Sequence, residues 1–290
     1  TLPIIINNLL LNLKSKKKIN NIKTICVGNI YVGGTGKTTT TIKLYEILKK
    51  FNFNIATAKK HYSSQIDEQI LLKNKTHFIS ANSRNHIIDK ALKKSINLII
   101  FDDGLQDRNL SYDLKFVCFD TGNWIGNGEL IPSGPLREKL DSLKKYDAIF
   151  LKDNNNKKEL ISKLITIKNP EIKIFNTKYK PINLQKFYNK KKYLIFSGIG
   201  TPQDFKQILQ KNSINIIDEI VYPDHFNYKS YDIENIKQRA KKADAEIITT
   251  EKDFVKISKE DRENINFLEI SLDIENEEEL IKFIKSKIYD

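Results

Sequence analysis

Residues 22–41, IKTICVGNIYVGGTGKTTTT, decide the fold of this 290-residue chain. The first part is an apolar run that predicts a buried strand, and the stretch that begins at Lys37 predicts a helix. The turn between them contains Gly33, Gly34 and Gly36. Glycines at such a junction let backbone N–H groups surround phosphate oxygens, and the helix N-terminus adds partial positive charge. The segment therefore predicts a phosphate-binding loop.

The side chains of this loop predict ATP and Mg²⁺ as cofactors. Lys37 is expected to bridge phosphate oxygens, and the Thr38 hydroxyl is expected to ligate Mg²⁺. The regular motif has a glycine five positions before Gly36, and this chain has Tyr31 there. The motif is incomplete, but its place between strand and helix still indicates nucleotide binding. The predicted nucleotide-binding residues are Gly33, Gly34, Thr35, Gly36, Lys37 and Thr38.

A second acidic motif supports this site. The apolar run 97–103, NLIIFDD, predicts a strand that ends in Asp102 and Asp103. Phosphoryl transfer needs a carboxylate at a strand end beside the phosphate loop to hold Mg²⁺ or its water. Paired aspartates at a strand end also cap turns, so the interpretation depends on the phosphate loop nearby. Either aspartate fits the metal role.

Strands and helices alternate along the chain, which predicts an α/β fold. The first part is expected to be a P-loop NTPase-like domain with a largely parallel sheet. The pattern restarts after about residue 180, which predicts a second, smaller α/β domain. The expected domains are residues 1–183 and 184–290. The runs that predict strands are 22–30, 53–58, 97–103, 114–120, 146–152, 193–200, 214–222 and 246–250.

Composition narrows the expected compartment and partners. The formal net charge is +13, but lysine is spread evenly along the chain, so no nucleic-acid partner is expected, and no protein partner is implied. Cys26 and Cys118 each lie in an apolar run, which fits reduced, structural core cysteines. The apolar stretch 2–13 is followed by a cluster of lysines up to residue 18, a pattern of an interfacial helix or of an ordinary packing helix.

Two classes of function fit a loop of this kind: a P-loop kinase, whose small acceptor the loop does not specify, and a non-enzymatic nucleotide switch. Partition-type and electron-transfer ATPases have a similar loop, and Thr38-Thr39 matches theirs. Those proteins have a signature lysine directly before the glycine pair. This chain has Val32 there, which disfavours the switch.

From about Ile22 to Ile257, the order of further motifs resembles the tetraacyldisaccharide 4′-kinase family. The variant loop, which also lacks the first glycine in that family, is followed by several matching segments. They are Asp102-Asp103-Gly104-Leu105-Gln106, Gly126-Asn127-Gly128, Pro132-Ser133-Gly134-Pro135-Leu136-Arg137-Glu138, Gly198-Ile199-Gly200-Thr201-Pro202 with Phe205, Asp224-His225 and Thr250-Glu251-Lys252-Asp253.

The resemblance implies transfer of the ATP γ-phosphoryl group to the 4′-hydroxyl of an acylated diglucosamine lipid in lipid A biosynthesis. It implies that Asp67 is the base at the acceptor hydroxyl and that His225 orients it. Arg137 would neutralise charge on the transferred group, and Glu138 would join Thr38 and an aspartate in organising Mg²⁺. Without the resemblance, Asp67 alone is better interpreted as a helix N-terminal acid, and His225 alone as a surface or N-cap neighbour histidine.

A lipid substrate, together with the stretch 2–13 and its lysines, predicts peripheral attachment to the anionic cytoplasmic face of the inner membrane. The sequence also departs from the family pattern. The Ser-Arg-Gly-Tyr segment is Lys59-Lys60-His61-Tyr62, and the segment before Asp67 is shortened. The histidine that follows Gln106 in the family is Asp107.

Overall fold

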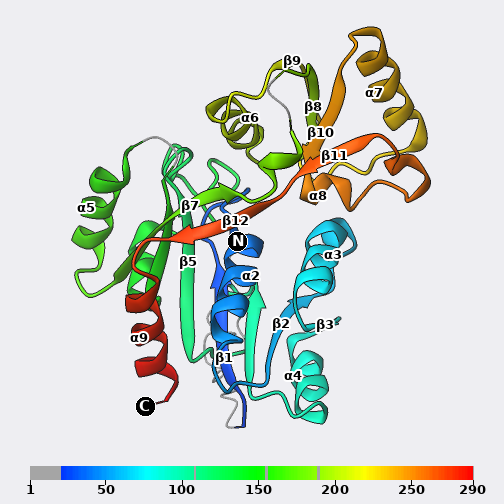
Figure 1. Ribbon diagram of the computed structural model, residues 1–290. Coiled ribbons are helices and arrows are strands. Elements are labelled where there is room, and N and C mark those ends of the chain that lie inside the picture. Colours follow the sequence, from blue (N-terminus) through cyan, green and yellow to red (C-terminus); the bar gives the residue numbers. More distant parts are fainter. Residues whose placement is uncertain (1–20, 108, 154–155, 188–189, 290) are drawn as a thin grey trace. The chain divides into compact units, whose positions relative to one another are not determined.

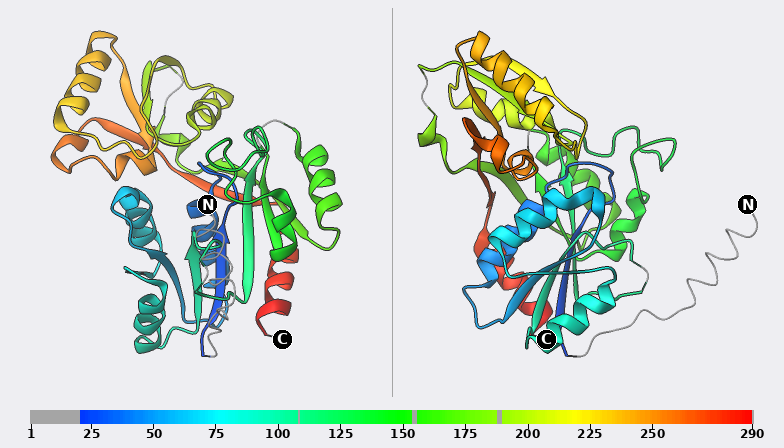
Figure 2. Two further views of the ribbon diagram at one scale, coloured as in Figure 1. Left: turned by 180° about the vertical axis from the view of Figure 1, so that it is seen from behind. Right: turned by 90° about the vertical axis from the view of Figure 1, so that its right-hand side faces the viewer.

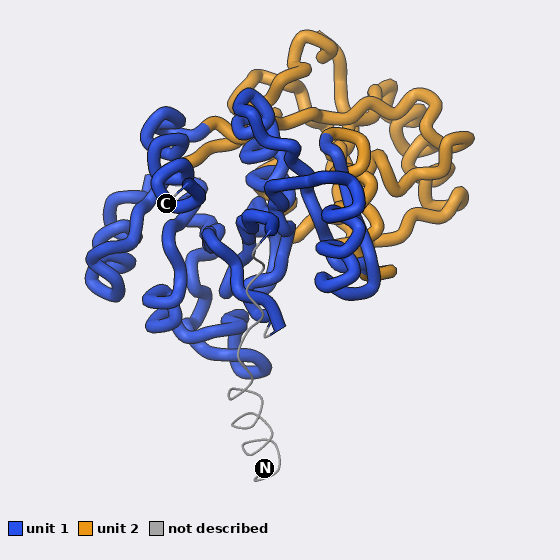
Figure 3. Tube along the Cα trace, turned by 90° about the horizontal axis from the view of Figure 1, so that it is seen from below, with its two compact units in different colours: residues 1–61, 76–176, 274–290 blue, residues 62–75, 177–273 orange. Residues whose placement is uncertain are grey.

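A computed structural model (Figure 1) describes residues 21–107, 109–153, 156–187 and 190–289. The chain forms two compact units, shown in two colours in Figure 3. Unit 1 contains residues 1–61, 76–176 and 274–290, and unit 2 contains residues 62–75 and 177–273.

Six strands of unit 1 belong to an eight-stranded sheet with the order β12-β7-β6-β5-β1-β4-β2-β3, and its strands β7 and β12 include residues of unit 2. Five neighbouring pairs, from β6 through β5, β1, β4 and β2 to β3, are parallel. Parallel strands bring their carboxyl ends to one edge, which is where open α/β sheets bind ligands. The strands are β1 (Lys23–Gly28), β2 (Ile55–Lys60), β3 (Phe78–Ala81), β4 (Leu98–Asp102), β5 (Leu114–Asp120), β6 (Ala148–Lys152), β7 (Lys173–Pro181) and β12 (Ile270–Ile274).

Helices cover both faces of this sheet, as the edge-on view in Figure 2 shows. On one face lie α2 (Lys37–Leu48) and α9 (Glu277–Ile288), where Phe283 packs on Phe116. On the other face, α4 (Arg84–Lys93), the short helix 140–145 and α5 (Lys158–Lys168) bury their apolar sides against strand residues. The sheet is apolar on both faces because it is covered on both faces.

Unit 2 has a four-stranded parallel sheet in the order β11-β10-β8-β9. Helix α7 packs on one face through Ile233 and Ile236, and α6 packs on the other through Phe205 and Leu209. The strands are β8 (Tyr193–Ser197), β9 (Ile216–Val221), β10 (Glu246–Thr250) and β11 (Ile265–Leu268). The helices are α3 (Ile66–Lys75), α6 (Pro202–Lys211), α7 (Ser230–Lys242) and α8 (Glu251–Phe254).

The fold class expected from the sequence is confirmed: a P-loop NTPase-like α/β unit with a largely parallel sheet, and a second, smaller α/β unit. The two buried cysteines are also as expected. The division of the chain differs from 1–183 and 184–290, because α3 belongs to unit 2 and residues 274–290 belong to unit 1. The physical reasons are tertiary: Lys75 of α3 pairs with Glu251 and Glu269, and α9 packs on the large sheet.

Within the described ranges, no helix combines the length and apolar character that crossing a membrane requires. The stretch 2–13 and the lysines after it, which carry the prediction of membrane contact, lie outside the described residues.

Candidate functional site

The phosphate loop connects β1 to α2 in unit 1. Two of its glycines adopt left-handed backbone conformations, Gly33 with φ of 127° and Gly36, at the start of α2, with φ of 82°. Residues with a Cβ are strained in this region, so glycine is needed at both positions. The side chain of Asn29 donates a hydrogen bond to the Thr35 hydroxyl over 3.0 Å inside the loop. The predicted turn is therefore formed, and the free N-terminus of α2 opens onto it.

A second segment braces this loop where the regular motif has its first glycine. Tyr31 forms an isolated antiparallel bridge with Leu136. Backbone hydrogen bonds run from Val32 N–H to the Pro135 carbonyl (2.9 Å) and from Arg137 N–H to the Ile30 carbonyl (2.7 Å). The motif 132–138 therefore fixes the entrance to the phosphate loop and places Arg137 beside it.

Asp102 ends β4 and is fully buried. Its Oδ2 accepts a hydrogen bond from the Thr38 hydroxyl (2.9 Å) and one from the ammonium group of Lys59 (3.0 Å). The structure thus directly joins two of the three residues predicted at the metal, Thr38 and Asp102. Lys59 is a third partner that the sequence interpretation did not include.

Asp103 turns away from Asp102, with a left-handed backbone φ of 62°. Its carboxylate lies 3.9 Å from Lys37 Nζ and 3.4 Å from Arg137 Nη1. Its carbonyl oxygen accepts a hydrogen bond from Arg84 Nη2 over 2.5 Å. Three cations therefore surround this one residue, and the predicted catalytic residues Lys37, Asp103 and Arg137 form one cluster.

Glu138, which follows Arg137 in the chain, is held by two hydrogen bonds. Its Oε1 accepts hydrogen bonds from Gln106 Nε2 (2.9 Å) and from the Tyr146 hydroxyl (2.7 Å). Burial and the neighbouring Glu138 carboxylate raise the pKa of Tyr146, so this hydroxyl stays protonated and donates. The contacts of Glu138 are thus with Gln106, Tyr146 and Lys145. Thr38 and Asp102, which Glu138 was expected to join at the metal, contact each other instead.

Few protein side chains are available to hold a metal ion at this site. In the described ranges, no three His, Cys, Asp or Glu side chains converge as a metal cluster. Mg²⁺, however, commonly takes one or two protein oxygens and completes its shell with phosphate oxygens and water. The Thr38 hydroxyl and the Asp102 carboxylate, 2.9 Å apart, are hard oxygen donors of that kind and fit the ion.

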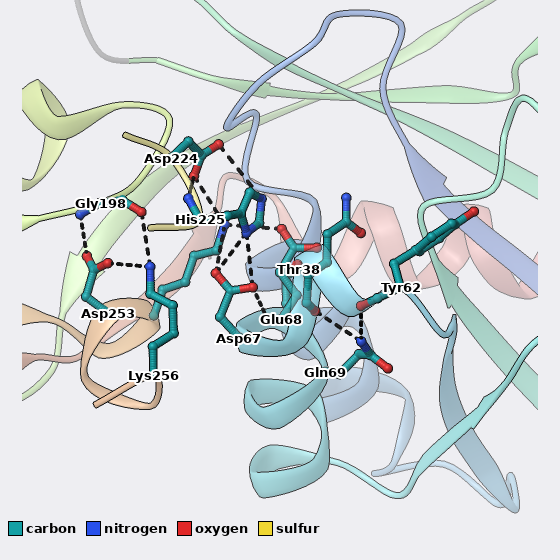
Figure 4. A network of polar contacts seen from close by, with 12 residues as sticks. Thr38, Tyr62, Asp67, Glu68, Gln69, Gly198, Asp224, His225, Asp253 and Lys256 are labelled. Atoms are coloured by element: carbon teal, nitrogen blue, oxygen red, sulfur yellow. Dashed lines mark hydrogen bonds and ion pairs between the residues drawn. The ribbon is translucent and has the colours of Figure 1, made fainter. Parts of the chain in front are cut away.

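Asp67 and His225 meet inside unit 2. Asp67 lies in the first turn of α3, and His225 lies in the loop after β9. His225 Nδ1 is 3.1 Å from Asp67 Oδ1 and 3.0 Å from Oδ2 (Figure 4). The domain bounds expected from the sequence, 1–183 and 184–290, placed these residues in different domains. Because α3 belongs to unit 2, the pair is instead formed within one unit.

Lys252 at the start of α8 supplies positive charge to this pair. Its Nζ is 3.2 Å from Glu68 Oε1, 3.6 Å from Asp67 Oδ2 and 3.8 Å from Asp224 Oδ1. Burial alone would raise the pKa of Asp67, but the hydrogen bond from His225 and the charge of Lys252 outweigh burial and lower it. Asp67 is therefore ionised at neutral pH. Burial opposes the charge of Lys252, yet its carboxylate neighbours raise the pKa of Lys252.

A buried carboxylate, Asp253, anchors the loop that holds His225. Asp253 accepts hydrogen bonds from Gly198 N–H (3.0 Å) and the Tyr228 hydroxyl (3.0 Å), and Lys256 pairs with it at 2.8 Å. The Gly198 carbonyl in turn accepts from His225 N–H. Figure 4 shows the contacts of Asp253 with Gly198 and Lys256.

Comparison with known proteins identifies the family. The model of the tetraacyldisaccharide-1-P 4′-kinase family matches residues 5–72 and 53–289. The chain belongs to this family. The tetraacyldisaccharide 4′-kinase of Pelagibacter ubique is 44% identical over 284 residues, with 97% of this chain and 90% of that protein covered. The enzyme of Rickettsia canadensis is 34% identical, with 88% and 81% covered.

A solved structure agrees on the fold. LpxK from Aquifex aeolicus, crystallised in complex with ATP, superposes with a TM-score of 0.74 at 23% sequence identity. The match covers 99% of this chain and 96% of that one. This likeness spans both units, so the tetraacyldisaccharide 4′-kinase fold is present along nearly the whole chain.

Sequence reasoning missed four residues that contact the predicted site residues. Lys59, Arg84 and Gln106 contact the aspartates or Arg137, and Lys252 contacts Asp67. Gln106 and Lys252 stand in segments that resemble the 4′-kinase family, so the motifs pointed at them without giving a role. Lys59 stands where the family pattern has serine, and Arg84 begins a helix. Their contacts depend on tertiary structure.

Proposed function

We propose that this chain transfers the γ-phosphoryl group of ATP to the 4′-hydroxyl of a tetraacyldisaccharide 1-phosphate, a step of lipid A biosynthesis. The observation that carries the proposal is the braced phosphate loop with Thr38 bonded to Asp102, in a chain that belongs to the 4′-kinase family. Membership of the family supports the acylated disaccharide as the acceptor, and the phosphate loop supports ATP as the phosphoryl donor.

On the donor side, unit 1 binds and neutralises phosphate. The loop amides and Lys37 would hold the phosphate oxygens, and Thr38 and Asp102 would hold Mg²⁺. The ion, when bound, neutralises charge on the phosphates and so favours phosphoryl transfer. Arg137, placed 3.4 Å from Asp103, provides a further cation for the transferred group. We assign Glu138 an indirect part in this site: it accepts a hydrogen bond from Gln106, which also donates to the carbonyl of Asn29.

On the acceptor side, unit 2 supplies the base. Asp67 is ionised and bonded to His225, so the pair takes the proton of the hydroxyl, either at Asp67 itself or through the imidazole. General bases of this kind contribute about 10²–10⁴-fold to rate. Phosphoryl transfer needs donor and acceptor groups in one active complex.

The location proposed for the enzyme is the cytoplasmic face of the inner membrane, held peripherally. The support is the lipid acceptor together with the apolar stretch 2–13 and its following lysines. Apolar burial combined with attraction to anionic headgroups gives reversible attachment of this type.

The experiment that tests the function is a phosphate-transfer assay with labelled ATP. The acylated disaccharide 1-phosphate is compared with the same disaccharide lacking acyl chains and with simple alcohols. The proposal expects transfer to the acylated acceptor at a rate far above ATP hydrolysis. Preferential transfer to a soluble acceptor would favour a kinase of another substrate, and hydrolysis alone would favour a nucleotide switch.

A further inference from the structure

Lys59, near the end of β2, has a deeply buried ammonium group. Its side chain is 1% exposed, and its Nζ lies 3.0 Å from Oδ2 of Asp102, which is itself fully buried. Lysine is almost never buried to this degree unless it is paired, because removing its charge from water is costly. The burial of this ion pair therefore needs a functional explanation.

The Asp102 oxygen that Lys59 contacts, Oδ2, also accepts a hydrogen bond from the Thr38 hydroxyl. Lys59 thus shares an oxygen with the residue proposed to ligate Mg²⁺. It is also a departure from the family pattern, since Lys59-Lys60-His61-Tyr62 replaces Ser-Arg-Gly-Tyr. This chain has an ammonium group where that pattern has a small hydroxyl.

We propose that Lys59 is an internal counter-ion of Asp102 that weakens Mg²⁺ binding at the phosphate site. The inference rests on the proposed assignment of Asp102 to the metal. Before the metal arrives, the ammonium group balances the buried carboxylate and fixes the oxygen that Thr38 uses. When the metal arrives, the same ammonium group repels it and holds one of the carboxylate lone pairs. Lys59 therefore positions the Asp102 carboxylate, and its positive charge lowers the affinity of the site for Mg²⁺.

The test measures metal binding without an acceptor. The enzyme is saturated with a non-hydrolysable ATP analogue, and Mn²⁺ binding is followed by electron paramagnetic resonance, with Mg²⁺ as competitor. Lys59→Ser, which restores the family residue, is expected to bind the metal about 10- to 100-fold more tightly, the range over which outer-shell partners change metal affinity. Unchanged or weaker binding in Lys59→Ser would overturn the proposal.

A second variant guards against misfolding. Lys59→Met keeps the side-chain volume and is expected to show the same tightening, together with a larger rise in unfolding temperature on addition of Mg²⁺ than the parent shows. Adding Asp102→Asn to Lys59→Met should abolish the tightening. If the double variant still binds the metal as tightly as Lys59→Met, Asp102 is not the affected ligand and the proposal fails.

The same sheet offers a matched control. Lys152 at the end of β6 pairs with Asp120 at the end of β5, 2.6 Å apart, with side chains 3% and 2% exposed. Asp102 is on β4, three strands from β6, or roughly 14 Å at the usual strand spacing. Lys152→Met removes an equally buried ammonium group and should leave metal affinity unchanged. A gain equal to that of Lys59→Met would mean that general loss of positive charge is responsible, which contradicts the proposal. None of these readings requires kinase turnover, so they stand apart from the test of the function.

Discussion

The Asp67 carboxylate and the His225 imidazole are 158 residues apart in the chain, and their hydrogen bond predicts that they work as one unit. Removing either by Asp67→Asn or His225→Ala should lower kcat by about 10²–10⁴-fold. The double variant should cost little more than the worse single variant, because one partner cannot act without the other. ATP affinity should change little. Multiplicative losses in kcat across the double-mutant cycle would show that the two residues act independently.

Lys252 predicts a pH effect at the same pair. Its charge helps lower the pKa of Asp67, against the neighbouring Glu68 and burial, which raise it. Lys252→Met should therefore raise the pKa of Asp67. Activity needs the ionised carboxylate, so the acid limb of the kcat profile should move to higher pH, whereas Lys252→Arg should move it little.

Lys75 is the matched control for this prediction. It also bridges two carboxylates, and its side chain is 21% exposed compared with 23% for Lys252. It lies at the other end of α3 from Asp67, eight residues or about 12 Å along the helix. Lys75→Met should leave the acid limb in place. An acid limb that stays fixed in Lys252→Met, with only a lower kcat, would assign Lys252 a purely structural role.

Candidate residues could be chosen from the sequence where a local pattern limits the chemistry, whereas their roles stay predictions. The strand–turn–helix at 22–41 led to Lys37 and Thr38, and the acidic end of the strand 97–103 led to Asp102, the partner of Thr38. The contact between Asp67 and His225 was expected only through family resemblance, since no local pattern joins them. Lys59 was not foreseen as a partner of Asp102, because only the pairing of β2 with β4 brings the two side chains together.

At the scale of elements, short helix α8 and its buried Asp253 predict a structural role for a family motif. Asp253 joins the N–H of Gly198, the Tyr228 hydroxyl and Lys256. Asp253→Ala leaves these groups buried without their acceptor, so we expect the free energy of unfolding of unit 2 to fall by about 3–5 kcal/mol. Urea unfolding followed by hydrogen exchange in β8 and β10 measures this loss.

The hydrogen bond from His225 N–H to the Gly198 carbonyl leads to a second expectation for Asp253→Ala. Where Asp253→Ala is still folded, kcat should fall because the loop that carries His225 loses its anchor. ATP binding should be retained. Asp261→Ala is a suitable control, since that carboxylate is hydrogen-bonded on the exposed surface to Ser230 and Ser258. Equal destabilisation by both variants would contradict the anchoring role of Asp253.

Elements were easier to predict than their assignment to units. The strands 114–120 and 246–250 were predicted with the bounds that the structure has, because each is short and rich in β-branched or aromatic residues. The membership of α3 in unit 2 was not predictable in the same way. It depends on the ion pairs of Lys75 with residues 251 and 269, far along the chain, and sequence periodicity contains no information on such partners.

For the whole molecule, the proposed peripheral attachment predicts how binding to vesicles depends on the N-terminal segment. Deletion of residues 1–18 should weaken binding to vesicles that contain anionic lipid, and high salt should partly release the full chain. Exchanging the lysines at 14, 16, 17 and 18 for glutamine separates the contributions, since each lysine near such a surface contributes about 1 kcal/mol. Vesicle binding that survives the deletion unchanged would assign attachment to another surface.

The measurement that tests the account most directly is phosphate transfer by the Lys37→Ala enzyme. Labelled ATP and the acylated disaccharide 1-phosphate are supplied to the parent and to the variant, after circular dichroism has shown that both are folded. Lys37 begins α2 at the phosphate loop, so its loss should lower the transfer rate by at least about 10²–10³-fold, the usual effect of removing a preorganised charge contact. Lys43→Ala, on the same helix but paired with Glu277, should retain transfer. Near-parental transfer by folded Lys37→Ala would contradict the site and the function built on it.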